Sequence, residues 1–177
     1  MHVTLRRHPT SVDPGVDTIE VTVERATHGL LTLRYTVTGA LDRIVRPAAA
    51  RPDRTDGLWQ STCFELFLRR EGEAAYREFN FAPSGRWAAY QFTGYREGMV
   101  QAPLPAPPQI QVRAQGGRFD MEVTLDAALE DAPYAMNITA ILESQAGERS
   151  FWAAKHPVGE PDFHDPGCFI HRLPPAV

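Results

Sequence analysis

A glutamate lies in the middle of an otherwise apolar segment, residues 61–69, where a carboxylate needs a chemical explanation. In an extended strand, successive side chains point to opposite faces. One face would carry Thr62, Phe64, Leu66 and Leu68, and the other would carry Cys63, Glu65 and Phe67. Burying a carboxylate is unfavourable unless a cation, hydrogen-bond donors, a metal or water compensates it. Two interpretations are open: Glu65 belongs to a structural ion pair, or it lines a ligand-binding cleft.

The next segment, residues 75–94, predicts a β-hairpin. Pro83 and Gly85 fit a type I turn that is closed by a left-handed glycine. This turn sets the register Ala82–Arg86, Phe81–Trp87, Phe79–Ala89 and Glu78–Tyr90. A two-residue turn would pair Asn80 with Trp87 instead and would split the apolar residues between both faces. We therefore expect the bulged turn.

In this register the hairpin has one apolar face and one mixed face. The mixed face carries Tyr76, Glu78, Asn80, Arg86 and Tyr90. Aromatic rings stack on the C–H groups of sugars, while carboxylate, amide and guanidinium groups form hydrogen bonds with hydroxyls. The mixed face is therefore a candidate site for a ligand with many hydroxyl groups. A solvated sheet face with a stacked arginine–tyrosine pair would show the same pattern.

The C-terminal third contains two further groups of chemically capable residues. Trp152 and His156 lie in the first, and the run from Pro161 to Pro166 adds His164 between two aspartates. Histidine and carboxylates bind metals, but this spacing matches no established metal motif, so we expect no metal site. Either histidine could act as a general base. No nucleophile elbow, phosphate loop or dinucleotide-binding glycine motif accompanies them, so no catalytic residue is assigned.

Alternation of apolar and polar residues indicates the elements that must position these groups. It is clearest over residues 19–24, 31–37 and 119–125, and further strands are expected at 61–69, 75–82, 86–94, 109–113, 137–144, 150–155 and 167–173. About ten short strands predict an all-β fold, an antiparallel β-sandwich of the immunoglobulin-like or jelly-roll kind. Residues 46–56 and 101–108 are expected to be loops, the second one crossing between sheets. A short helical turn is expected near residues 126–130.

Bulk composition describes an ordinary globular chain. Its 177 residues, 43% hydrophobic and 23% charged, fit a single domain spanning residues 1–177. The net charge of −4 argues against generic binding to nucleic acid or to an anionic membrane. The two cysteines, Cys63 and Cys168, do not make a disulfide framework and are expected to be buried thiols. Because we find no secretory or membrane-spanning segment, we expect a cytoplasmic protein.

Several stretches, over most of the chain from Leu58 onward, resemble a known family. The run Leu58-Trp59, followed by residues 63–67 and then 76–90, resembles the DOMON-like proteins related to family 9 carbohydrate-binding modules. The stretches 152–157 and 161–164 are similar to an uncharacterised bacterial branch of that family. The resemblance implies a β-sandwich that binds a ligand without catalytic machinery or a cofactor. In sugar-binding relatives, two tryptophans enclose a terminal sugar.

The resemblance also implies site residues. By their places in the motif, Trp59, Glu65 and Arg86 match the sugar site, and Trp152 is the candidate for the second tryptophan. Some DOMON-like relatives bind haem through methionine and histidine, and Met99 with the histidines here matches no such pattern. The sugar-binding modules usually occur in secreted multidomain enzymes. Because no secretion signal is recognised in this sequence, we expect an intracellular sugar or another metabolite as the ligand rather than a polysaccharide.

The leading hypothesis is a non-catalytic domain that binds a small molecule, a sugar or sugar-like metabolite. Its binding residues would be Trp59, Glu65, Glu78, Asn80, Arg86, Tyr90, Trp152, His156 and His164. A second hypothesis is an enzyme that uses Glu65 with His156 or His164 in acid–base chemistry. A haem-binding domain is a third, and an assembly domain in which the tryptophans are core or interface anchors is a fourth. The sequence does not determine the oligomeric state.

Overall fold

The computed structural model describes residues 1–26 and 29–176, which form twelve strands and short 3₁₀ turns. The strands are β1 (His2–Arg7), β2 (Val16–Arg25), β3 (Leu30–Gly39), β4 (Cys63–Arg70), β5 (Tyr76–Phe81), β6 (Trp87–Phe92), β7 (Val100–Gln101), β8 (Gln109–Gln115), β9 (Arg118–Asp126), β10 (Tyr134–Glu143), β11 (Arg149–Ala153) and β12 (His171–Leu173). The 3₁₀ turns are η2 (Leu41–Arg43), η3 (Leu58–Gln60) and η4 (Pro166–Cys168). Within the described residues, none of these helices has the length and apolar character needed to span a membrane.

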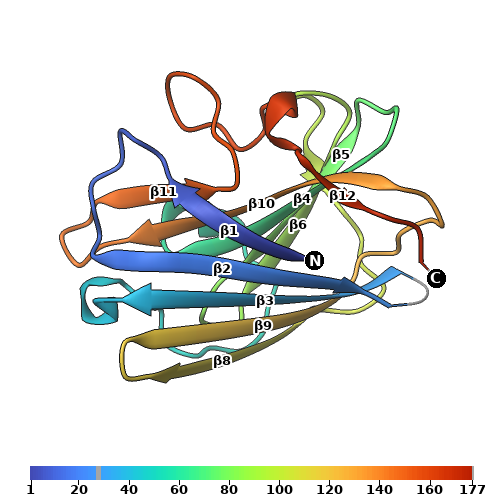
Figure 1. Ribbon diagram of the computed structural model, residues 1–177. Coiled ribbons are helices and arrows are strands. Elements are labelled where there is room, and N and C mark those ends of the chain that lie inside the picture. The colour runs from blue at the N-terminus through green and yellow to red at the C-terminus, as the bar shows by residue number, and fades with distance from the viewer. Residues whose placement is uncertain (27–28, 177) are drawn as a thin grey trace.

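All named strand pairs are antiparallel, and they follow one path, β7-β6-β5-β4-β10-β11-β1-β2-β3-β9-β8, with β12 added beside β10. β1 joins the two halves of the sheet, because residues 2–5 pair with β2 while residues 6–7 pair with β11. The sheet curls so that β2, β3 and β9 lie across from β4, β5 and β10 (Figure 1). The antiparallel all-β prediction is confirmed, but the layers are halves of one continuous sheet, an open half-barrel.

The main core lies between these two halves. Tyr35 on β3 packs 5.0 Å from Phe64 on β4, and Phe64 stacks at 5.7 Å on Phe119 of β9, as measured between ring centroids. The Tyr35 hydroxyl is satisfied because it donates a hydrogen bond of 3.1 Å to the carbonyl of Glu65. These contacts fix β4 against the opposite layer and decide which of its faces points away from the core.

A second apolar cluster covers the other face of β4, β5, β6, β10 and β11. It contains Phe67, Tyr76, Ala88, Tyr90, Phe92, Ile141, Ala153, Phe163 and Phe169. Phe163 and Phe169 belong to the segment between β11 and β12, which returns over this face. The strand parity predicted for residues 61–69 is confirmed, since Phe64, Leu66 and Leu68 lie in the main core and Phe67 lies in this second cluster.

The hairpin is also as predicted. Phe81 pairs with Trp87, Glu78 pairs with Tyr90, and the Ala82 amide donates to the Arg86 carbonyl. Gly85 has a φ of +91°, the left-handed conformation that the bulged turn requires. The turn at residues 82–86 therefore sets the faces of both strands.

Some details of the fold differ from the predictions or were not predicted. The helical turn expected near residues 126–130 is wrong: Ala128 has a φ of +46°, and its amide donates to the Asp126 carboxylate in an extended loop. β1 and β7 were not predicted, and they raise the strand number to twelve. The loop predicted at residues 46–56 is confirmed. The loop predicted at residues 101–108 is confirmed except for Gln101, which ends β7, and it connects the two halves of the sheet. Cys63 and Cys168 are buried and free.

Candidate functional site

A cavity of about 430 Å³ opens on the face of β4, β5, β6, β10 and β11 that points away from the main core. Its polar lining consists of Glu65, Glu78, Arg96 and His164. Its aromatic lining consists of Trp59, Phe67, Phe92, Phe151 and Phe163, and Met99, Ile141 and Pro161 complete the wall. Convergent polar groups in an aromatic cavity of this size are typical of a small-molecule site.

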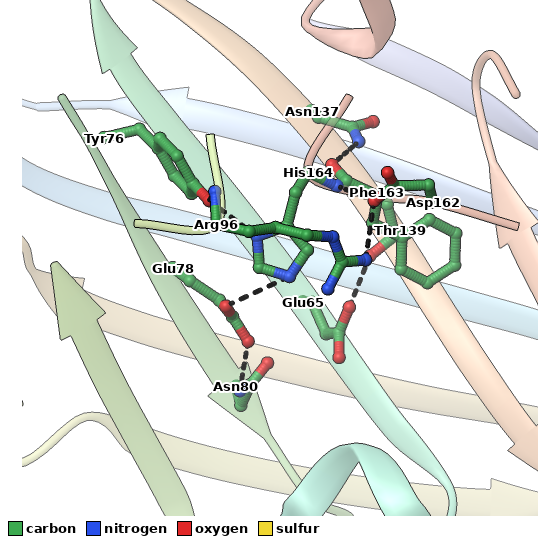
Figure 2. Close-up of polar contacts among 10 residues, drawn as sticks. All are labelled: Glu65, Tyr76, Glu78, Asn80, Arg96, Asn137, Thr139, Asp162, Phe163 and His164. Carbon is green, nitrogen blue, oxygen red and sulfur yellow. Dashed lines mark hydrogen bonds and ion pairs between the residues drawn. The ribbon is translucent and has the colours of Figure 1, made fainter. Parts of the chain in front are cut away.

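Glu65 lies at the floor of the cavity, in the centre of β4. Its side chain is almost fully buried, with 2% relative exposure. One carboxyl oxygen accepts a hydrogen bond of 2.9 Å from the Thr139 hydroxyl on the neighbouring β10 (Figure 2). Burial and, secondarily, the charge of Glu78 raise the pKa of Glu65 to about 8, although the bond from Thr139 acts in the opposite direction. The Glu65 carboxyl is therefore mainly protonated at neutral pH.

Glu78 enters the same cavity from β5. The Asn80 side-chain amide donates a 2.7 Å hydrogen bond to one oxygen of Glu78, and the other oxygen lies 3.8 Å from His164 Nε2 (Figure 2). Burial raises the pKa of Glu78 to about 7, against the hydrogen bond from Asn80 and the charge of Arg96. Both glutamates therefore titrate near neutrality, where a small change in their surroundings alters their charge.

His164 forms one wall and is neutral at pH 7. Its ring packs edge-on against Phe67 and Phe92, with both centroid distances 5.2 Å. Its Nδ1 lies 2.7 Å from the Tyr76 hydroxyl, with which it shares a hydrogen bond. Burial, followed by the charge of Arg96, lowers the pKa of His164 to about 4. The approach of His164 to Glu78 is therefore not an ion pair at neutral pH.

Arg96 closes the mouth of the cavity from the loop between β6 and β7. Its guanidinium binds the Asp162 carboxylate at 2.7 Å, and its amide donates to the Tyr76 hydroxyl at 3.3 Å. Its backbone φ of +56° is unusual for a residue with a side chain and is typical of functional or tightly constrained positions. Asp162 in turn accepts a hydrogen bond from the His164 amide at 3.0 Å. This network ties the 93–99 loop to the C-terminal segment.

Four of the residues predicted from the sequence line the cavity: Trp59, Glu65, Glu78 and His164. Two others adjoin it. Asn80 supports Glu78, and Tyr90 packs edge-on against Trp59 at 5.9 Å while its hydroxyl donates to Asp56 at 2.7 Å. These six residues come from η3, β4, β5, β6 and the C-terminal segment, which the fold brings together.

The structure places the other three predicted residues outside the cavity lining. Arg86 is exposed in the hairpin turn. Trp152 is buried in the main core at 4% exposure, and its indole N–H donates to the Ser150 hydroxyl at 2.9 Å. His156 packs edge-on against His8, with a centroid distance of 4.8 Å, and its Nε2 lies 2.8 Å from the Arg6 carbonyl.

Sequence reasoning missed Arg96 and the aromatic wall formed by Phe92, Phe151 and Phe163. Arg96 lies in a tight turn, residues 94–97, that carried no motif. Phe151 stands next to Trp152, so one of these two adjacent aromatics had to face the cavity side, and alternation alone does not say which one. In residues 1–26 and 29–176, no group of three histidine, cysteine or acidic side chains is placed to hold a metal ion.

Comparison with known proteins identifies relatives in fold only. No protein-family model and no curated protein matches the sequence. A structure of a candidate carbohydrate-binding protein from Bacteroides uniformis is similar with a TM-score of 0.62 and 15% identity, over 94% of this chain and 84% of that one. Two structures of a family 9 carbohydrate-binding module from Caldicellulosiruptor kristjanssonii are similar at 9% identity. The complex with cellotriose has a TM-score of 0.53, over 90% of this chain and 74% of that one. The complex with glucose has a TM-score of 0.50, with 85% and 72% covered.

Proposed function

We propose that this protein is a non-catalytic domain that binds a small sugar or sugar-like metabolite in the cavity above β4 and β5. The observation that carries this proposal is the combination of a partly exposed tryptophan, Trp59, with the buried hydrogen-bonding groups of Glu65 and Glu78 in one cavity. The similar folds of modules that were crystallised with glucose and cellotriose support it. The relationship to DOMON-like proteins and a cytoplasmic location are further parts of the same proposal.

The cavity can supply both kinds of contact that a sugar ring needs. Trp59 offers an indole face for the C–H groups of the ring, and the phenylalanines extend the apolar wall. Protonated Glu65 and Glu78 can each donate one hydrogen bond to a hydroxyl and still accept another. Because Trp152 lies in the main core, the second aromatic surface in this proposal is Phe151 or Phe163 rather than a second tryptophan.

Tryptophan fluorescence combined with calorimetry tests the proposal. The chain has three tryptophans, and Trp87 and Trp152 are buried outside the cavity, so a sugar should change only the emission of Trp59. We expect saturable binding of mono- or oligosaccharides, with an emission change that Trp59→Phe removes and the matched control Trp152→Phe retains. Bound sugar should be recovered unchanged after prolonged incubation.

Two results would overturn the proposal. One is the absence of heat or emission change with a broad set of mono- and disaccharides, amino sugars included. The other is an emission change that persists in Trp59→Phe and disappears in Trp152→Phe, since the sugar would then bind elsewhere. Turnover of the sugar would instead favour the acid–base enzyme, and Glu78→Gln would then be the variant that abolishes it, because Glu78 is the glutamate that approaches His164.

A further inference from the structure

The floor of the cavity presents two acidic side chains side by side. β4 and β5 pair Glu65 with Asn80 and Phe67 with Glu78, so the two glutamates are diagonal neighbours on one face of the sheet. Glu65 and Glu78 are only 2% and 5% exposed, and both line the cavity. Figure 2 shows the two carboxyl groups below Arg96 and His164. A ligand that enters the cavity therefore meets both of them.

Each carboxyl group has unused acceptor capacity. Thr139 binds one oxygen of Glu65, and Asn80 binds one oxygen of Glu78. In the part of the chain that the structure describes, the second oxygen of Glu65 has no hydrogen-bond donor, and the second oxygen of Glu78 is 3.8 Å from His164, its nearest basic neighbour. Once ionised, a carboxylate has about four lone-pair sites, so each of these two glutamates could accept further donors from a ligand.

Among the described residues, the lining of the cavity brings no free cation to the floor. Besides His164, the basic side chain of this lining is Arg96. Its charge lowers the pKa of Glu78, but its guanidinium is paired with the Asp162 carboxylate and not with either glutamate. His164 is neutral at pH 7 because burial lowers its pKa. The surrounding walls are aromatic, from Phe67, Phe92 and other rings, and aromatic faces attract cations electrostatically. An acidic floor with aromatic walls favours a positively charged ligand group.

We propose that the cavity selects a ligand with a protonated amine, which binds between Glu65 and Glu78. This inference rests on the proposed function and names its class of ligand, an amino sugar. The sugar ring packs on the aromatic wall, and the ammonium group donates hydrogen bonds to the two carboxylates. The neutral hydroxyl of an ordinary sugar can bond the protonated carboxyls, but only a cationic group stabilises the ionised form of both glutamates.

Binding of an ammonium group must change the protonation of the floor. The pKa values of about 8 and 7 for Glu65 and Glu78 mean that the two carboxyls together carry at least one proton at pH 7 before a ligand binds. An ammonium ion favours both ionised forms, so this proton is released to solvent. The uncharged groups that face the pair are Thr139, Asn80 and neutral His164. The titratable groups are the phenols Tyr35, Tyr76 and Tyr90 and the Cys63 thiol, and burial raises the pKa of each of them, so they stay protonated at pH 7. The charged groups are those of the Arg96–Asp162 ion pair.

Isothermal titration calorimetry at pH 7 with four probes tests the proposal. The probes are glucose, glucosamine, N-acetylglucosamine and cyclohexylamine, and each is titrated in two buffers with different ionisation enthalpies. We expect glucosamine to bind at least about tenfold more tightly than glucose, equivalent to about 1.4 kcal/mol. Only the amine-bearing probes should show a buffer-dependent heat, which measures the released proton.

Variants locate the amine. Glu65→Gln and Glu78→Gln keep the shape of the side chain but cannot ionise, so each should remove the roughly tenfold preference for glucosamine over glucose. Glu122→Gln is the matched control, because Glu122 is a glutamate on β9 that pairs with Arg34 outside the cavity. This control should keep the preference and the proton release.

The outcomes separate this inference from the proposed function. If glucose binds as tightly as glucosamine, the amine assignment is overturned and sugar binding stands. If cyclohexylamine binds and no sugar does, sugar binding is overturned and the amino-sugar assignment fails with it. If glucosamine binds more tightly and both glutamine variants keep that preference, the ammonium group does not bind at Glu65 and Glu78, and the inference is overturned.

Discussion

Replacing Glu65 with glutamine should stabilise the folded protein at neutral pH, and the stabilisation should grow with pH. The pKa of Glu65 is raised from 4.5 to about 8, mainly by burial. A carboxyl whose pKa is raised on folding contributes its full stability below pH 4.5 and loses it as the pH rises toward 8. Between these values, each pH unit destabilises the folded state by up to about 1.4 kcal/mol relative to a side chain that cannot ionise.

The magnitude follows from this window. At pH 7 the accumulated penalty is about 3 kcal/mol, and above pH 8 it approaches about 5 kcal/mol. This is a large share of the stability of an ordinary domain, about 5–15 kcal/mol. A glutamine side chain at this position would keep an oxygen to accept the hydrogen bond from Thr139. Below about pH 5, the wild type and Glu65→Gln should therefore have nearly equal free energies of unfolding.

Urea denaturation of both proteins from about pH 5 to about pH 8.5, without added sugar, measures this difference. Glu122→Gln is again the control: Glu122 pairs with Arg34 outside the core, and its replacement should change the free energy of unfolding by less than about 0.5 kcal/mol at every pH. A difference between wild type and Glu65→Gln that is the same at both ends of this pH range would refute the reasoning. It would mean that Glu65 ionises in the folded state without penalty and therefore has a compensating partner.

Two further predictions concern residues on either side of the sheet. Trp152→Ala should lower the free energy of unfolding by about 3–5 kcal/mol, because Trp152 fills the main core. In the same denaturation experiment Trp59→Ala should lower it clearly less, because Trp59 is partly exposed. Equal losses in the two variants would contradict this assignment. Asn137→Ala should cost about 1–3 kcal/mol and weaken sugar binding in calorimetry, because the buried Asn137 amide donates at 2.9 Å to the Phe163 carbonyl and anchors the C-terminal segment over the cavity. Unchanged sugar affinity in that variant would show that the segment is held by other contacts.

Much of the strand architecture could be predicted because it depends on neighbouring residues. The turn around Pro83 and Gly85 sets the pairing of β5 with β6, since a bulged turn allows one register that keeps the apolar residues on one face. Alternation in β4 similarly placed Glu65 on the face opposite Phe64. The unfavourable burial of a carboxylate then marked Glu65 as a residue to explain, and the structure places it at the floor of the cavity.

Other features needed distant contacts. β1 alternates apolar and polar residues, but it bridges the two halves of the sheet. It does so because it pairs with β2 and with β11, two strands that lie far apart in the chain. In β11, Phe151 and Trp152 are adjacent and point to opposite faces of the strand, so each face carries one aromatic residue. The alternation of side chains therefore could not say which of the two reaches the cavity. The packing of Trp152 beside Ser150 inside the main core decides it.

The sequence by itself therefore determined most of the strands, the hairpin register and the face on which Glu65, Glu78 and Asn80 lie, because period-two alternation and turn geometry are local. Only the tertiary structure decided that this face is covered. The segment between β11 and β12 folds back over it, bringing His164 against Glu78 and Asp162 against Arg96, although these partners are far apart in the chain. Such contacts form because the aromatic outer face of β4, β5 and β6 must be shielded from water, and no local pattern specifies which segment shields it.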